Sequence, residues 1–507
     1  MSIESIKKEQ SISTAVKTMK PFAFALRHLV AGALCAFFST NSPGASPDAT
    51  VVTYPAPVGE AVSTEYRVEV NGCPVDVYPA QTPYHDGKYY FAYFDFSGEV
   101  NVHVTSSRSL DKVEILPGSA GIAPTLKTSD TIVFTVHRPF KISVERDGQN
   151  SPLLLFGNPL EKDAPTAGDS NVVYFGPGVH KPGKITLTSN QTLYLAGGAI
   201  VKGGVEARGE NIRILGRGIL DGNDYPHRRG PTTFMLHLEK CKNISVKDLI
   251  LRGSWFFTIA PCGCDRVTID NVKICGSRVL NDDGIDPINS SNVTIHDCFV
   301  RTQDDCIAPK GLKGYDDKSC ENISVTDCLL WTDVANIFRI GYESDAGGMR
   351  DITARNIDVL HFVDTRPVEH FWTKCVFCIQ PSNNMPMSGL RFEDFRINAA
   401  GNRNLLVKIL PMMCHGWSLG VYEKTGKLSA WAYQEPGRYV KNCRFKNIHL
   451  SGKAGGRPGM IYVVGAGDDH PVENITFENV TRFGEPVSAD SPDVRIGPHA
   501  SNVKFLP

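Results

Sequence analysis

The sequence lacks an excess of charge of either sign. Lys and Arg number 53 and Asp and Glu number 54 among 507 residues, which gives a formal net charge of −1. Such a chain offers no overall electrostatic attraction to nucleic acid or to an anionic membrane surface. It also lacks, beyond its N-terminal region, an apolar run of about 18 or more residues, the length that spans a bilayer. These absences exclude an integral membrane protein and predict no nucleic-acid or membrane partner.

Disorder is excluded by composition as well. Hydrophobic residues make up 41% of the chain and charged residues only 21%, as in a soluble globular protein with a large core. The length suggests about three domains, although single all-β domains can run much longer.

The N-terminal region is typical of an export signal. Leu29 to Phe38 form a ten-residue apolar run, too short to span a bilayer, with Lys20 and Arg27 before it and small polar residues after it. We therefore expect residues 1–46 to be a signal peptide and leader, starting at Met1 or Met19, and the mature protein to be secreted, extracellular or periplasmic. The alternative is an uncleaved N-terminal anchor.

Cysteine is present, with 14 residues, but its role is open. A secreted protein favours disulfides, whereas cysteines inside β-type segments, such as Cys275 and Cys298, also pack as small buried hydrophobic residues. The pairs Cys262-x-Cys264 and Cys375-x-x-Cys378 have no second pair at zinc-ligand spacing. The sequence therefore predicts no metal.

An internal repeat decides the fold. Eight segments share the order apolar, polar, apolar, any, Asn or Asp, apolar, and their first residues are 23, 26, 30, 29, 38, 53 and 32 residues apart. The segments are Ile244–Leu249, Val267–Val272, Val293–Cys298, Ile323–Cys328, Ile352–Ile357, Leu390–Phe395, Cys443–Ile448 and Ile475–Val480. Alternation with period 2 predicts strands, and a base period in the twenties predicts a solenoid.

The recurring Asn or Asp predicts a turn, because these side chains tolerate the left-handed backbone region and stacked amides can hydrogen-bond along a ladder. One strand–turn–strand coil per repeat, stacked on parallel neighbours, is a right-handed parallel β-helix. A β-propeller is the alternative, but its blades need about 40 residues each. We expect the β-helix over residues 166–507.

Residues 47–165 differ, because they alternate without the Asn ladder and are punctuated by Pro and Gly. This pattern predicts an antiparallel β-sandwich. Its expected role is to cap the end of the solenoid, with carbohydrate binding as the alternative. The longer steps imply insertions at about 360–388 and 400–440.

Three aspartates carry the candidate chemistry. Asp283 and Asp304 are 21 residues apart, about one coil, so a parallel solenoid stacks them on adjacent strands about 4.8 Å apart, and Asp305 lies beside Asp304. Crowded carboxylates raise at least one pKa, and a raised acid beside an ionised base can cleave a glycosidic bond. The alternatives are plain turn residues or a calcium site.

The run from Asn281 to Gly311, NDDGIDPINSSNVTIHDCFVRTQDDCIAPKG, resembles the active-site coils of family 28 glycoside hydrolases, the polygalacturonases and their relatives. The stretches YFGPGVH, LYLAGGAIVKGGVE and GRGILDGNDY are similar to first-coil segments of family 49, the dextranases and isopullulanases, which pair the β-helix with an N-terminal β-sandwich. Both families invert the configuration at the anomeric carbon.

The resemblance implies Asp304 as general acid and Asp283 with Asp305 as the pair that activates water. It places Asn281 at the first position of the family 28 motif, where it would orient a neighbour or the sugar, with a plain turn Asn as the alternative. Lys310 lies where these families often carry a lysine near the site, with a solvated lysine as the alternative. No cofactor is implied.

The chain departs from family 28 on the next coil. It reads ANIFRIGYE from Ala335 to Glu343, without the Gly-His-Gly and Arg-Ile-Lys motifs. A galacturonate substrate is therefore in competition with a neutral glucan. Arg339 can still bind a carboxylate or sulfate, or else pair with Glu343 or Asp345. Tyr342, like Trp255 and Trp372, is a candidate for stacking on sugar, with core or loop packing as the alternative for each.

The sequence thus predicts a secreted, monomeric, inverting glycoside hydrolase with a polysaccharide or oligosaccharide substrate, and with Asn281, Lys310, Arg339, Tyr342 and Glu343 as substrate-binding residues. Two other classes stay open. A β-helix lyase would need calcium and a basic residue, and a non-catalytic β-helix would bind glycan without turnover.

Overall fold

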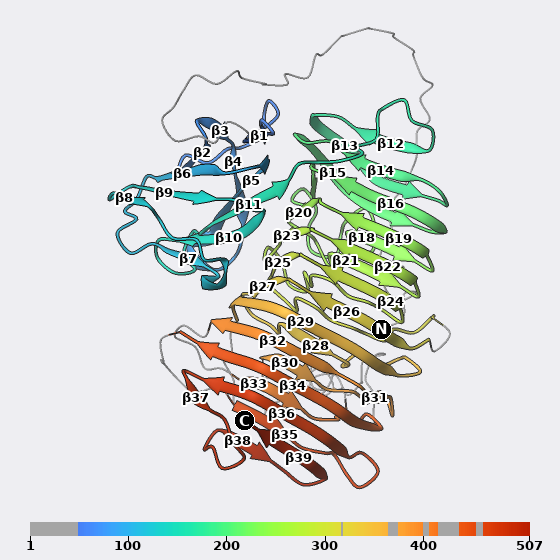
Figure 1. Cartoon of the computed structure of the whole chain (residues 1–507). Coiled ribbons are helices and arrows are strands. Elements are labelled where there is room, and N and C mark those ends of the chain that lie inside the picture. The colour runs from blue at the N-terminus through green and yellow to red at the C-terminus, as the bar shows by residue number, and fades with distance from the viewer. Residues whose placement is uncertain (1–48, 316–317, 363–373, 399–404, 414–434, 453–459) are drawn as a thin grey trace.

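A computed structural model describes residues 49–315, 318–362, 374–398, 405–413, 435–452 and 460–507. These residues form a β-protein with two short 3-10 helices, η1 (His85–Gly87) and η2 (Gly118–Ala120). Figure 1 shows a small N-terminal sandwich beside a long solenoid. No helix in the described ranges is long and apolar enough to cross a membrane. The expected signal segment, residues 1–46, lies outside them.

The solenoid is a right-handed parallel β-helix, as the repeat predicts, and each coil passes through three faces. The outer face consists of β12 (Val172–Phe175), β14 (Thr192–Leu195), β16 (Glu210–Gly216), β19 (Lys242–Lys247), β22 (Asp265–Asp270), β24 (Ser291–His296), β26 (Cys320–Thr326), β29 (Met349–His361), β31 (Pro386–Ser388), β32 (Arg391–Asn398), β34 (Tyr439–Ser451), β36 (Val472–Arg482) and β39 (Ala500–Leu506). The two-residue β37 (Glu485–Pro486) folds back antiparallel on β36.

The other two faces carry shorter strands. The sandwich face starts with β13 (Gly178–Leu187) and β15 (Ala199–Ala207) and continues with β17 (Ile219–Asp221), β20 (Ile250–Arg252), β23 (Lys273–Cys275), β25 (Phe299–Thr302), β27 (Leu329–Thr332) and the ends of β29, β32, β34 and β36. The site face contains β18 (Leu236–Glu239), β21 (Ile259–Cys262), β28 (Phe338–Ile340), β30 (Cys375–Ile379), β33 (Leu405–Ile409), β35 (Met460–Val463) and β38 (Val494–Ile496).

The predicted Asn/Asp ladder is present at the bend between the outer and sandwich faces. All eight ladder positions have positive φ, between 49° and 71°. Asn447 donates to Asp394 Oδ1 at 2.8 Å and accepts from Asn479 at 2.8 Å, and Asn271 donates to Asp248 at 2.7 Å. The ladder therefore both permits the sharp bend and ties successive coils together.

A second ladder, not predicted from the repeat pattern, runs along the opposite end of the outer face. Asn243 donates to Asn211 at 2.7 Å, Asn292 donates to Asp265 at 2.7 Å, and Asn502 donates to Asn474 at 2.6 Å. Asn243, Asn292 and Asn502 each lie just before the first apolar residue of an outer strand, a position that the repeat alignment could have revealed.

The third strand of each coil was also missed. The repeat pattern predicts one strand–turn–strand unit per coil, whereas the site face adds segments of three or four buried residues, such as Ile259–Cys262. A short strand with both faces covered shows no polar alternation, so periodicity cannot reveal it.

One continuous core fills the solenoid from Ile185 to Val480. Like residues stack on like along its axis, and the rings of Phe445 and Phe477 lie 5.0 Å apart in a stacked arrangement, as do those of Phe477 and Phe505 at 4.9 Å. In-register stacking buries the whole apolar face of every internal coil, which no coil could achieve alone.

The N-terminal domain consists of two sheets around a shared core. One contains β1 (Thr50–Thr53), β4 (Val77–Gln81), β5 (Lys88–Ser97), β7 (Glu114–Leu116), β10 (Phe140–Glu145) and β11 (Leu153–Pro159), and the other contains β2 (Tyr66–Val70), β3 (Cys73–Val75), β6 (Val100–Ser106), β8 (Leu126–Lys127) and β9 (Thr131–Val136). The expectation of a purely antiparallel sandwich is wrong at one pair, since β11 runs parallel to β5. The reason is that Leu153–Asn158 are buried throughout, as is usual in parallel strands.

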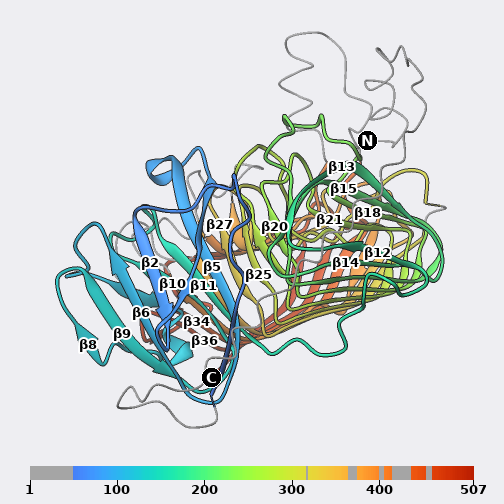
Figure 2. The same ribbon diagram turned by 90° about the horizontal axis from the view of Figure 1, so that it is seen from above.

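The sandwich lies along the side of the solenoid and does not cap its end, contrary to the expected role (Figure 2). Alternate residues of β5 explain this position: Tyr90, Ala92 and Phe94 belong to the sandwich core, whereas Tyr89 and Phe91 pack against the sandwich face of the solenoid. The second cluster reaches from Ile200 to Leu360 and thus spans many coils.

None of the twelve described cysteines forms a disulfide with another of them, and all but Cys73 are buried. The sequence left open whether the cysteines form disulfides or pack as small hydrophobic residues, and the buried cysteines fit packing.

The ladder yields a stability prediction. Asn447→Ala should lower the free energy of unfolding by about 2 kcal/mol, because it removes two hydrogen bonds and places a Cβ-bearing residue without a polar side chain at φ 52°. Asn447→Gly keeps the backbone freedom and should cost less. Denaturant titration of both variants measures the difference, and equal losses would contradict a contribution from backbone strain.

Candidate active site

The site face places the acidic residues in register on consecutive coils. Parallel bridges join Ile259 to Ile285, Ile285 to Ile307, and Ile307 to Phe338. Asp283, Asp305 and Asn336 lie two positions before Ile285, Ile307 and Phe338, respectively. Main-chain bonds confirm this register, since Gly284 N donates to Asp305 O and Cys306 N donates to Asn336 O, at 2.9 and 3.0 Å.

The three predicted carboxylates meet. One oxygen each of Asp283, Asp304 and Asp305 lies within 4.8 Å of the other two. The 21-residue spacing predicts that Asp304 is stacked on Asp283, whereas the in-register partner of Asp283 is Asp305, with Asp304 one residue earlier at the bend. Asp283 and Asp305 are 2% and 8% exposed, and Asp304 is only partly buried. Asp304 is therefore the most accessible of the three.

Gly284 makes this close approach of the coils possible. A Cβ on Gly284 would lie 2.5 Å from Cys306 O and 2.5 Å from Val300 Cγ1. Any other residue would push apart the two coils that carry Asp283 and Asp305. Steric exclusion of a side chain thus explains why the motif has glycine at position 284.

Lys310 places a positive charge beside the carboxyl groups of Asp283 and Asp286. Its ammonium lies 2.5 Å from Asp283 Oδ2, 3.5 Å from Asp286 Oδ2 and 3.7 Å from the centre of the Phe257 ring. The solvated alternative for Lys310 is wrong, because the side chain is buried. Burial alone would lower the pKa of Lys310, but Asp283 and Asp286 raise it well above its usual range, so the ammonium keeps its charge.

The environment of each carboxyl group differs. Burial raises the pKa of Asp283 well above its usual range, and the charge of the Lys310 ammonium opposes that rise without cancelling it. Burial and then the charge of Asp305 raise the pKa of Asp304. Asp305 Oδ1 accepts hydrogen bonds from Asn336 N at 2.9 Å and Asn336 Nδ2 at 2.6 Å, which fix the position of this oxygen.

Two further acids lie behind the trio, and neither was among the predicted site residues. Burial raises the pKa of Asp282 to about 7, although its oxygens accept main-chain bonds from Gln303 and Arg278 at 2.7 and 2.8 Å. Burial raises the pKa of Asp286 to about 8 against the pull of Lys310. Both belong to the run that drew attention to Asp283, so sequence could have found them.

Asn281 fits the predicted role of orienting a neighbour. Its Nδ2 donates to Asp304 Oδ2 at 3.3 Å, and its Oδ1 accepts from Arg228 Nη2 at 3.2 Å. It also has the positive φ of a turn residue, 57°. The turn and the polar contact are thus both present.

Arg339, Tyr342 and Glu343 lie on the next coil. The Arg339 guanidinium is buried 4.1 Å from the centre of the Tyr342 ring and donates to Cys378 Sγ at 3.4 Å. This packing differs from the ion pair with Glu343 or Asp345 that the sequence left open. Tyr342 is 6% exposed, so its ring contacts Arg339 and offers little surface for stacking on sugar. The Glu343 charge contributes to the raised pKa of Lys310.

Trp255, the other aromatic candidate that the structure describes, does not line the site. Trp255 is fully buried in the solenoid core and donates from Nε1 to Thr232 O at 3.2 Å. Trp372 lies outside the described residues, as does most of the predicted insertion at 400–440.

Two side-chain sets in the described ranges have the composition of a metal site: the trio itself, and Glu206, His237 and Glu239. In the first set the Lys310 ammonium already contacts Asp283. In the second set Lys184 and Arg208 contact the two glutamates.

Comparison with known proteins supports the resemblance. The family model described as "Glycosyl hydrolases family 28" matches residues 207–313, which include the trio. A probable polygalacturonase of Arabidopsis thaliana is 34% identical over 102 residues, covering 20% of this chain and 22% of the relative. A probable exopolygalacturonase B of Aspergillus fumigatus is 24% identical over 312 residues, covering 54% and 66%. The chain therefore spans less than two thirds of either relative.

The fold also has a solved counterpart. Dex49A from Penicillium minioluteum matches with a TM-score of 0.60 and 15% identity, over 89% of this chain and 96% of that chain. At this identity the likeness shows the fold alone, and it confirms the expected β-helix architecture.

Asp286 gives a prediction on pH. Its side chain keeps a proton up to about pH 8 when folded but loses it near pH 4 when unfolded, so folding takes up a proton between these values. This contribution makes the free energy of unfolding fall as the pH rises from 4 to 8. Asp286→Asn cannot ionise, so the variant should match the wild type at pH 4 and exceed its stability by a few kcal/mol at pH 8. Denaturant titrations at both values test this, and parallel pH profiles would contradict it.

Proposed function

We propose that this protein is a glycoside hydrolase that cleaves a polysaccharide with Asp283, Asp304 and Asp305. The observation that supports it most is the approach of three carboxylate oxygens within 4.8 Å, two buried and one partly exposed. The family match over residues 207–313 supports the same reaction class. Calcium-dependent elimination and binding without turnover have no comparable support.

In this proposal Asp304 is the general acid. Its raised pKa keeps a proton on the carboxyl group, and its partial exposure gives the proton access to the glycosidic oxygen. Asp304 protonates the leaving oxygen as the bond to the anomeric carbon breaks. A water molecule attacks this carbon and gives one proton to the pair Asp283 and Asp305. The leaving sugar thus gains the proton of Asp304, and the anomeric carbon gains the hydroxyl group of the water.

Inversion at the anomeric carbon is proposed from the resemblance to families 28 and 49. Carboxyl pairs of inverting enzymes are usually about 6.5–9.5 Å apart, to leave room for water. The trio is closer, but its two base candidates are held by other groups, Asp283 by Lys310 and Asp305 by Asn336. The proposal assigns these held oxygens to binding the attacking water.

The charge of the site face favours an anionic sugar. Beyond the trio, Arg339, Cys378 and Lys408 occupy equivalent positions on successive strands, followed by Tyr462 and Arg495. Arg339 and Lys408 are both buried, which places two positive charges beneath this half of the face. Although burial opposes it, a hydrogen bond from Cys375 and the charges of Arg339 and Lys408 lower the pKa of Cys378 to about 6. We therefore propose a uronate- or sulfate-bearing glycan over a neutral glucan.

Export is part of the proposal, because the N-terminal sequence resembles a signal peptide. The proposal takes the chain as a monomer, with a sandwich over residues 47–165 and a catalytic β-helix over residues 166–507.

The test of function is release of reducing ends from pectic, α-glucan and sulfated algal polysaccharides, with Asp304→Asn as the matched control. Asp304→Asn removes the proton donor without changing side-chain volume, so kcat should fall by about 10² to 10⁴-fold with an unchanged unfolding midpoint. Near-normal turnover by Asp304→Asn would show that another group is the acid. Ultraviolet-absorbing unsaturated products that require calcium would show a lyase instead.

The stereochemistry provides an independent test. Early-time proton NMR of the hydrolysate should show the first product with the anomeric configuration opposite to that of the substrate linkage. A first product of retained configuration would mean that one of the anchored carboxylates acts as nucleophile, and it would overturn the assignment of Asp283 and Asp305 as bases.

A further inference from the structure

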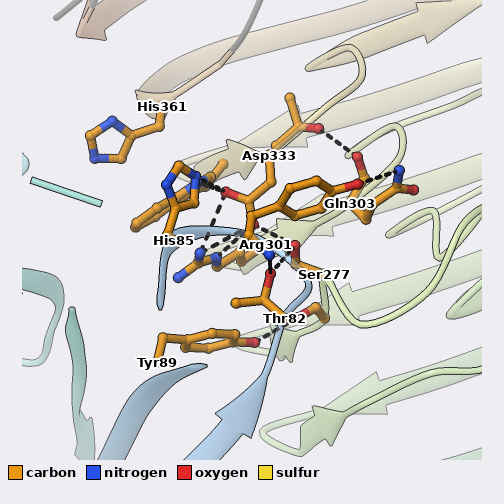
Figure 3. Close-up of polar contacts among 12 residues, drawn as sticks. Thr82, His85, Tyr89, Ser277, Arg301, Gln303, Asp333 and His361 are labelled. Atoms are coloured by element: carbon orange, nitrogen blue, oxygen red, sulfur yellow. Dashed lines mark hydrogen bonds and ion pairs between the residues drawn. The ribbon is translucent and has the colours of Figure 1, made fainter. Parts of the chain in front are cut away.

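A loop of the sandwich reaches the back of the candidate active site. It joins β4 to β5 over residues 82–87 and makes three polar contacts with the solenoid (Figure 3). Thr82 Oγ1 lies 3.2 Å from Ser277 Oγ, and His85 Nε2 lies 3.5 Å from Asp333 Oδ1. Between them, Tyr84 Oη accepts a hydrogen bond from Gln303 Nε2 at 3.1 Å.

The three solenoid residues occupy the same place on consecutive coils. Ser277, Gln303 and Asp333 each lie one or two residues after a strand of the sandwich face, where the chain bends toward the site face. Gln303 is the residue directly before Asp304. The loop therefore contacts the bends that lead into the carboxylates.

Hydrogen bonds connect these bends to the site. The buried Asp282 accepts from Gln303 N at 2.7 Å, from Asp304 N at 3.4 Å and from Arg278 N at 2.8 Å. Thr332 Oγ1 donates to Asp304 O at 2.8 Å. The backbone of Asp304 is thus held through its neighbours, and Gln303 is the neighbour that the sandwich contacts.

A buried ion pair fixes the loop against the solenoid. Arg301 donates to Asp333 from Nε at 3.2 Å, and Trp331 Nε1 donates to the same carboxylate at 2.8 Å. The Arg301 guanidinium lies between two rings, 4.1 Å from the centre of Tyr89 of the sandwich and 3.9 Å from that of Trp331. Figure 3 shows His85 and Tyr89 approaching this pair from the sandwich.

The loop backbone is strained. His85 and Asp86 have φ of 44° and 62°, a left-handed conformation that costs about 1–2 kcal/mol for each residue of this kind. Gly87 follows with φ 77°, which glycine adopts freely. A strained turn persists only where its surroundings hold it, and the contacts to Ser277, Gln303 and Asp333 do so.

We propose that the loop at residues 82–87 is a positioning element of the active site, and that Tyr84 is a positioning residue that holds Gln303 and thereby orients Asp304. This inference rests on the proposed function for its kinetic consequence, and on the contacts alone for its structural one.

The test compares Tyr84→Phe with Tyr78→Phe in the full chain. Both remove one hydroxyl group from the sandwich–solenoid interface, but Tyr78 Oη makes no hydrogen bond to the described residues of the solenoid. Hydrogen–deuterium exchange should be faster in the segment 300–306 of Tyr84→Phe and unchanged in Tyr78→Phe. With an active enzyme, Tyr84→Phe should lower kcat about tenfold at unchanged KM, because misorientation of the acid affects the chemical step.

A double-mutant cycle identifies the route. If Tyr84 acts through Gln303, Tyr84→Phe should add no further loss of kcat in a Gln303→Leu background. Full additivity would overturn the inference, as would wild-type kcat in an active Tyr84→Phe enzyme. If the wild type hydrolyses no polysaccharide, the proposed function fails and exchange in segment 300–306 alone decides the positioning: faster exchange supports it and unchanged exchange overturns it.

Discussion

Registration of consecutive coils is the constraint on which the site depends. Parallel strands lie about 4.8 Å apart, so residues at equivalent positions of neighbouring coils must meet, whatever their charge. Asp283 and Asp305 occupy such positions, two residues before bridged isoleucines. The core holds this register, because a slip of one residue would turn Ile285 and Ile307 out of it. The free energy of the apolar stack thus offsets the repulsion between the carboxylates.

Much of this arrangement could be predicted from the sequence because it is periodic. The Asn and Asp residues at the bend, the apolar alternation of the outer strands and the spacing between Asp283 and Asp304 are all local patterns repeated along the chain. The site face could not be predicted in the same way, since its strands are short and buried on both sides. The alignment of Asp283 with Asp305 also depends on a register that a coil length of 21 or 22 residues leaves open.

The hydrogen-bond partners near the carboxylates could not be predicted from the sequence for a different reason. Asn336 donates to Asp305 from 31 residues away, and Tyr84 contacts Gln303 across 219 residues. No local pattern marks either residue. The position of the sandwich had the same difficulty: β5 has two apolar faces, but only the folded chain shows that one of them covers the solenoid.

The trio illustrates how one side-chain type can acquire different roles. Asp283 and Asp305 lie in register on neighbouring coils, where main-chain hydrogen bonds fix their backbones. Lys310 and Asn336 hold their side-chain oxygens. Asp304 lies at the bend, outside that register, with a raised pKa and partial exposure. A proton donor needs both properties, but the bend lacks the fixed geometry of the sheet. The polar contact of Tyr84 reaches the chain at this bend, since Gln303 precedes Asp304, so the second domain adds to the hydrogen bonds with which Asp282 and Thr332 of the solenoid hold the Asp304 backbone.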